Sequence, residues 1–142
     1  MTEPIEPATR RTTVTPASDG SPARAVGMGI FGAAVGLAVF LLLAIVFSFT
    51  AGLVVVAIFT GRFVGLFVRA GAAGSLSSPA RTVVALVIFL IGMTLALGIT
   101  WLVAGLQGGV LSFGAFLDET YGTPLIALEY MLGTLMTWWS AK

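Results

Sequence analysis

The sequence predicts an all-α integral membrane protein in which four transmembrane helices form two hairpins, with both ends of the chain in the cytoplasm. Composition is the first reason for this prediction. Of the 142 residues, 58% are hydrophobic and only 9% are charged, whereas a soluble domain carries about 25% charged residues. The mean hydropathy is +1.06, so we expect a multi-pass protein of the inner (cytoplasmic) membrane, surrounded by the lipid bilayer.

The second reason is the length of the first apolar stretch. Residues 25–68 are apolar apart from Arg62 and some hydroxyl groups. As one helix they would extend about 66 Å, twice the thickness of the hydrocarbon layer. The stretch must therefore fold back, and the Ser, Thr and Gly of FSFTAG at 47–52 indicate the turn. This predicts helices over about 26–47 and 51–69, packed as antiparallel neighbours.

Two further helices are expected beyond the loop RAGAAGSLSSPAR at 69–81. The third covers about 82–106. Residues 107–122 are only partly apolar, and we expect a re-entrant or interfacial segment there. The fourth helix covers about 123–140, and its proline near the start suits a first helical turn.

The chain divides into a tail, residues 1–24, and a transmembrane helical bundle, residues 25–142. The tail is rich in Pro, Thr, Ser and Ala and has almost no large apolar side chains. Such a segment cannot offset the entropy lost on ordering, so we expect a disordered, flexible cytoplasmic tail.

The distribution of positive charge predicts the orientation, because cytoplasmic loops are enriched in Lys and Arg. With four helices and a cytoplasmic N-terminus, every basic residue lies on or nearest to the cytoplasmic side, and the acidic Asp118-Glu119 pair lies outside. A three-helix alternative would place Lys142 outside, with the last segment flat on the membrane surface. The basic residues are Arg10, Arg11, Arg24, Arg62, Arg69, Arg81 and Lys142.

The absence of cysteine and histidine limits the chemistry. It excludes disulfides, thiol catalysis, Cys- or His-ligated zinc, haem and iron–sulfur clusters, and Ser-His-Asp triads. Six scattered acidic residues make a carboxylate-only metal site a poor prospect. We therefore expect no catalytic residues, no cofactor and no metal. The net charge of +1 produces no strong field for nucleic acid.

Small residues at four-residue spacing occur in every predicted helix, and in lipid such faces allow close helix packing. They favour a close-packed bundle or a protein packed against partners. The aromatic residues nearest the expected membrane boundaries are predicted interfacial anchors. The packing candidates are Gly29, Gly32, Gly36, Gly61, Gly65, Gly92 and Gly133, and the anchors are Trp101, Trp138 and Trp139.

Two charged residues fall inside predicted spans, where charge is costly. Glu129 lies roughly 9 Å from the start of the fourth helix and shares a face with Gly133 and Thr137. Alone in hydrocarbon it would carry its proton at neutral pH, which suits proton or cation transfer. Arg62 lies about 10 Å inside the cytoplasmic boundary. It either extends to the inner headgroups or pairs with Glu129, from which it differs in depth by about 5 Å.

The stretches TGRFVGLFVRAGAAG and RTVVALVIFLIGMTLALG, together with the terminal TWWSAK, resemble small bacterial membrane proteins with four helices. The resemblance covers about residues 60–142 and implies no activity.

Three functions are compatible with these features. The favoured one is a non-catalytic accessory, structural or assembly subunit that packs against a larger membrane protein complex or forms a homo-oligomer. The alternative is a small ion or proton channel or transporter that uses Glu129. A membrane enzyme is the least favoured, because the chain lacks His, Cys and clustered carboxylates.

Overall fold

The computed structural model describes residues 20–46, 52–109 and 111–142, and the described part is entirely helical, without strands. The prediction of an all-α protein is therefore confirmed for these residues. Most of the predicted tail and of the 47–52 turn lies outside them. The elements are α1 (Pro22–Leu41), the π-helical turn η1 (Leu42–Val46), α2 (Leu53–Ala72), α3 (Ser78–Leu106), α4 (Phe113–Thr120) and α5 (Thr123–Ala141).

Three helical segments are long and apolar enough to cross a membrane, namely Pro22–Ile45, Leu53–Ala72 and Ser78–Leu106. Among the described residues, α5 is not one of these segments, although it has 19 residues. Its sequence is less apolar because it contains Glu129 and three threonines.

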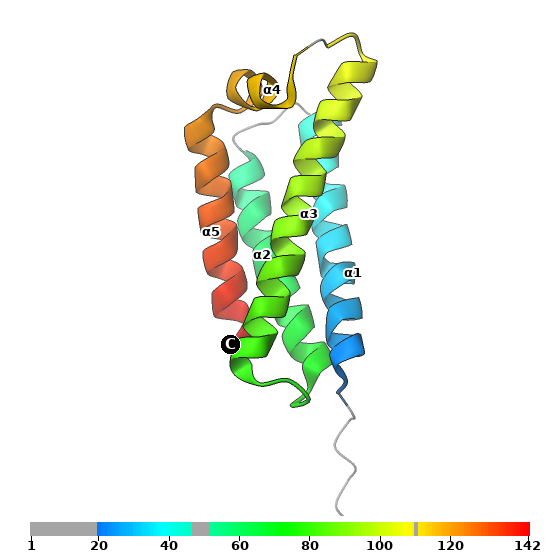
Figure 1. The fold of residues 1–142 in the computed structure, drawn as a ribbon, viewed down its shortest axis with the longest axis vertical. Helices are drawn as coiled ribbons and strands as arrows, with labels where there is room; N and C mark the ends of the chain where they lie inside the picture. The colour runs from blue at the N-terminus through cyan, green and yellow to red at the C-terminus, as the bar shows by residue number, and fades with distance from the viewer. Residues whose placement is uncertain (1–19, 47–51, 110) are drawn as a thin grey trace, which may run out of the picture.

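The helices α1, α2, α3 and α5 run along the long axis of the molecule, and α4 lies across one end (Figure 1). We call this end the α4 end. The start of α1 and the C-terminus lie together at the opposite end, which we call the basic end (Figure 1). The helix α2 lies in the middle and packs most extensively against α1 and α5. The first two helices are antiparallel neighbours, whereas α2 and α5 run in the same direction (Figure 1).

Two helices begin four residues earlier than predicted, at Pro22 instead of 26 and at Ser78 instead of 82. Both starts use a serine followed by proline, whose fixed φ and missing N–H suit the first helical turn. At the first start, Ser21 Oγ accepts a hydrogen bond of 3.1 Å from the Arg24 N–H. Residues 22–24 therefore belong to α1 and not to the tail.

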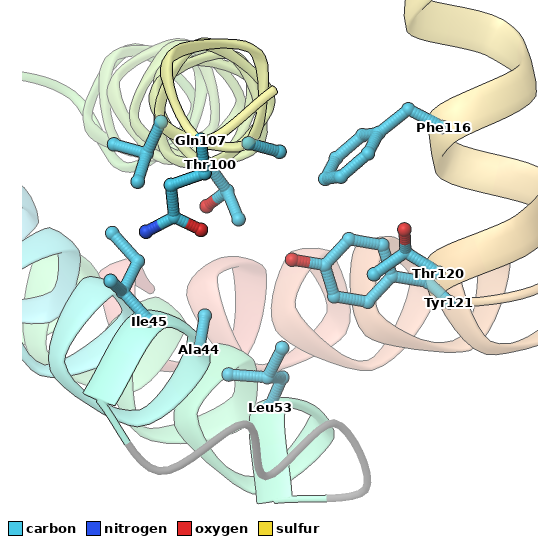
Figure 2. Close-up of a pocket in the computed structure, with 10 residues that line it drawn as sticks. Ala44, Ile45, Leu53, Thr100, Gln107, Phe116, Thr120 and Tyr121 are labelled. Carbon is cyan, nitrogen blue, oxygen red and sulfur yellow. The ribbon is translucent and has the colours of Figure 1, made fainter. Parts of the chain in front are cut away.

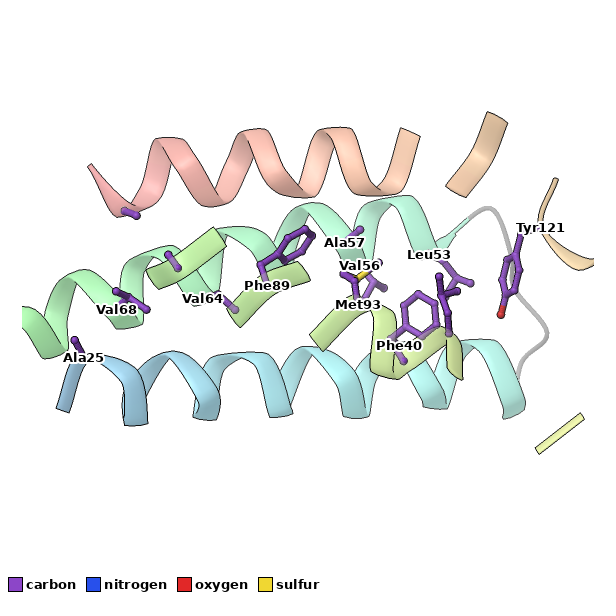
Figure 3. Packing of buried hydrophobic residues seen from close by; sticks show 14 of the residues in the cluster. Ala25, Phe40, Leu53, Val56, Ala57, Val64, Val68, Phe89, Met93 and Tyr121 are labelled. Atoms are coloured by element: carbon purple, nitrogen blue, oxygen red, sulfur yellow. The ribbon is translucent and has the colours of Figure 1, made fainter. Parts of the chain in front are cut away.

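Buried hydrophobic side chains of α1, α2 and α3 form the core (Figure 3). Glycines let the helices approach closely around it. On α1, a Cβ added to Gly36 would overlap the Thr60 side chain, and one added to Gly32 would overlap Phe67. On α2, a Cβ added to Gly61 would overlap the carbonyl of Gly133. Gly29, Gly65 and Gly133 are equally closed, by Val68, Ser140 and Phe89 respectively. The predicted packing glycines are thus largely used inside the bundle.

The segment after α3 folds over the α4 end (Figure 1). Trp101 Nε1 donates a hydrogen bond of 3.1 Å to the Leu111 carbonyl, and its ring packs edge-on against Phe113 with centroids 5.7 Å apart. Ser112 Oγ caps α4 by accepting from the Ala115 N–H at 3.4 Å. Trp101 therefore holds the start of α4 against α3, and α4 crosses the end of the bundle as an interfacial segment would.

Candidate functional site: a buried glutamate and a polar cavity

Glu129 is the most unusual residue of the bundle. Its side chain is fully buried, and neither carboxyl oxygen has a hydrogen-bond partner among the described residues. It lies one turn before Gly133, which packs between Gly61 of α2 and Phe89 of α3. The carboxyl group is therefore directed into the centre of the bundle. Burying a polar group without a hydrogen-bond partner costs free energy of folding, so the position of this carboxyl group requires an explanation.

Several hydroxyl groups of α3 and α5 are engaged in other hydrogen bonds. Thr137 Oγ1 donates to the Gly133 carbonyl at 2.7 Å, and Tyr130 Oη lies 3.1 Å from Thr94 Oγ1. Thr100 Oγ1 donates to the Ala96 carbonyl at 2.9 Å. These bonds satisfy the threonines through their own or neighbouring helices, as is common for threonine in helices, and leave Glu129 without a donor.

Arg62 does not pair with Glu129. Its side chain is exposed, and no described group bonds the Glu129 oxygens. The reason is the position of Arg62 around the axis of α2. Gly61 faces α5, and the side chain of the next residue points about 100° away. The Arg62 side chain is therefore directed out of the interface that contains Glu129.

A cavity of about 210 Å³ lies at the α4 end (Figure 2). The turn η1 and the start of α2 form its apolar wall through Ala44, Ile45 and Leu53. Its polar side is formed by Thr100, Gln107, Thr120 and Tyr121, and the Tyr121 hydroxyl points into the space between α3 and α2 (Figure 2). The cavity offers hydrogen-bond donors and acceptors but no charged lining residue.

Tyr121 is the titratable side chain among the residues that line this cavity. Burial raises the pKa of the Tyr121 phenol, the Thr100 hydroxyl acts in the opposite direction, and a negative charge on Glu129 raises the pKa further. The phenol therefore stays protonated at neutral pH and is available as a hydrogen-bond donor or acceptor.

The sequence did not indicate the cavity. Its polar residues come from α3, α4 and the residues that directly follow these helices, up to 21 positions apart. No spacing rule connects such residues, because only the crossing of α4 over the bundle brings them together.

The basic end carries most of the described positive charge. Arg24, Arg69, Arg81 and Lys142 lie at helix ends there (Figure 1). Arg81 Nη2 donates to the Lys142 carbonyl at 3.1 Å, and Lys142 Nζ lies 3.3 Å from the centroid of the Trp138 ring. The predicted anchors Trp138 and Trp139 are exposed at this end.

The fold and the site define a class, an all-helical protein with three helices able to span a membrane and a buried carboxyl group in its core. Among the described residues, no group of three or more His, Cys, Asp or Glu side chains could hold a metal ion. No family model matches the chain, and no curated protein or solved structure is similar to it.

Proposed function

We propose that this chain is a four-span protein of the inner membrane with both ends in the cytoplasm. It acts as a non-catalytic accessory or assembly subunit of a larger membrane protein complex. The observation that carries the proposal is a groove on the outer face of the bundle, between α1 and α3.

The packing of α5 supports a fourth span. This helix lies beside α2 along its length (Figure 1), and its face with Glu129, Gly133 and Thr137 is buried in the bundle. A surface-lying helix would instead turn across the end of the bundle, as α4 does. The charge distribution supports the orientation, because the basic end is positive and α4 at the other end carries Asp118 and Glu119.

The groove has a volume of about 410 Å³ and an almost purely apolar lining. At its floor, a Cβ added to Gly92 would meet only the Ala33 Cβ, at 3.4 Å. The other predicted packing glycines are closed by a neighbouring helix. In lipid, an open groove floored by small residues allows the close approach of another helix. We assign it to a transmembrane helix of the partner subunit.

Purification in mild detergent followed by native mass spectrometry tests this function. We expect the chain to be recovered with larger subunits. Ala34 is exposed in the groove, so Ala34→Phe should release the partner while the bundle stays folded. Val83→Phe is the matched control, because Val83 is exposed to lipid on α3 outside the groove. A lone monodisperse particle, a homo-oligomer, or equal effects of both variants would contradict the proposal.

A second candidate function is proton or cation transfer through Glu129, and the unpartnered buried carboxyl group favours it. The polar cavity lies at the α4 end, and Glu129 itself is fully buried and is not among the residues that line it. Towards the basic end, Phe89 closes on Gly133, and Thr137 is bonded to the backbone. In proteoliposomes, this function predicts that Glu129→Gln abolishes flux in a folded protein. Equal flux in both proteins would eliminate it.

A further inference from the structure

A second cavity, of about 370 Å³, lies between the ends of α2 and α5 at the basic end. Three of its lining residues are cationic and none is acidic. The full lining consists of Arg62, Leu66, Arg69, Trp139, Ser140 and Lys142.

The positive charges of this cavity come from two helices. Arg62 and Arg69 are seven residues apart on α2, so they share a face and are separated by about 10 Å along the axis. Neither guanidinium forms a hydrogen bond or ion pair with a described residue. Lys142 approaches from the end of α5, with its ammonium group on the Trp138 ring. None of the side chains that line the cavity is acidic, and the mutual repulsion of the three cationic side chains would be relieved by a bound anion.

The apolar residues of the cavity indicate where that anion comes from. Leu66 of α2 and Trp139 of α5 are exposed. With both helices spanning the membrane, these side chains face lipid at the level where the helices approach the boundary. Tryptophan is enriched at this level, among the headgroups. A soluble anion gains no favourable contact from these apolar side chains, whereas the glycerol and first methylene groups of a lipid would pack against them.

We propose that this cavity binds the phosphate of an anionic glycerophospholipid of the cytoplasmic leaflet. Arg62 and Arg69 supply planar guanidinium donors that suit bidentate phosphate binding, and Lys142 adds a third charge. A zwitterionic lipid brings its own cation, which three positive side chains disfavour. The site rests on the proposed membrane orientation, and it depends neither on the partner subunit nor on transfer through Glu129.

This assignment gives Arg62 a role despite its position inside a span. Its long side chain extends from within the hydrocarbon layer towards the headgroups, where the cavity holds Arg69 and Lys142 as well. A charge that would otherwise be costly in lipid is thereby joined to the lipid's own phosphate.

Native mass spectrometry of the full chain, delipidated and titrated with either phosphatidylglycerol or phosphatidylcholine, tests the site. We expect a clear preference for phosphatidylglycerol. Arg62→Gln and Arg69→Gln should each lower its affinity about fivefold, and the double variant about 25-fold. Arg24→Gln is the matched control, because Arg24 is exposed at the same end but lies on α1 outside the cavity.

Two outcomes of the lipid titration would overturn the site. Equal binding of the two lipids would indicate that an acidic protein segment occupies the cavity instead. An Arg24→Gln effect as large as that of Arg62→Gln would show that the cavity is not specific. Displacement of phosphatidylglycerol by an equal concentration of inorganic phosphate would identify a soluble-anion site instead. If Arg62→Gln does not fold, Arg69→Gln alone decides. An error in the proposed membrane orientation would be detected separately, by the cysteine-labelling experiment in the Discussion.

Discussion

Gly61 of α2 and Gly133 of α5 pack backbone to backbone, and a Cβ on Gly61 would overlap the Gly133 carbonyl oxygen. Two helices running in the same direction can approach this closely only where side chains are missing. The contact lies one turn from Glu129, so it also determines how tightly the carboxyl group is enclosed.

The first prediction concerns this contact. Gly61→Ala should lower the free energy of unfolding by about 1–3 kcal/mol, because a backbone carbonyl cannot move aside for the added methyl group. Denaturant titration in detergent micelles measures the change. Gly98→Ala on α3 is the control, since a Cβ there meets nothing within 4 Å. It should be neutral or stabilising by up to about 1 kcal/mol. Equal behaviour of the two variants would show that the α2–α5 contact is looser than described.

The second prediction concerns the burial of Glu129. Glu129→Met keeps the length of the side chain and removes two unpartnered oxygens, so it should raise the free energy of unfolding by about 1–3 kcal/mol. Leu128→Met, at an exposed neighbouring position, controls for the methionine and should have little effect. A loss of stability in Glu129→Met would show that a bound ion or water interacts with the carboxyl oxygens.

The third prediction concerns orientation, and the absence of cysteine from the chain makes it easy to test. Single cysteines are introduced at Ser75, between α2 and α3 at the basic end, and at Glu119 on α4. In intact cells, an impermeant maleimide should label Glu119→Cys and should label Ser75→Cys only after the membrane is opened. The reverse pattern would invert the proposed orientation, and equal labelling of both would contradict a membrane-spanning bundle.

The fourth prediction concerns Tyr121 and pH. Its folded-state pKa is raised above the ordinary value of 10.0, so the folded protein resists deprotonation more than the unfolded chain. The stability linked to this group is fully present below pH 10 and is lost as the pH rises through the folded-state pKa. Unfolding midpoints measured between about pH 8 and 11 should therefore fall less steeply in Tyr121→Phe than in the wild type.

Tyr130→Phe provides the contrast for this experiment. It removes the contact of the hydroxyl group with Thr94 Oγ1 and should cost about 1 kcal/mol at neutral pH. It should keep the wild-type loss of stability at high pH. A Tyr121→Phe curve parallel to the wild type would show that the phenol is not buried as described.

Much of the fold followed from features that are local in the chain. The apolar length of 25–68 requires a fold-back, because one helix would be twice as long as the membrane is thick. The first helix begins earlier than its apolar residues predict, because the Ser21-Pro22 pair determines its start. The glycine spacing predicted contact faces, but it could not distinguish contacts within the bundle from contacts with a partner.

The sequence by itself determined that this is an apolar helical protein, the approximate extent of its four long helices, and that Cys and His chemistry is absent. These properties depend on composition and on distances along one chain. Only the tertiary structure decided that Arg62 and Glu129 stay apart, that most glycine faces are closed internally while that of Gly92 is open, and that Arg62 meets Arg69 and Lys142 at one cavity. The physical reason is that depth in a membrane follows from counting residues. The rotation of each helix about its axis and the choice of its neighbours follow from packing of the whole bundle.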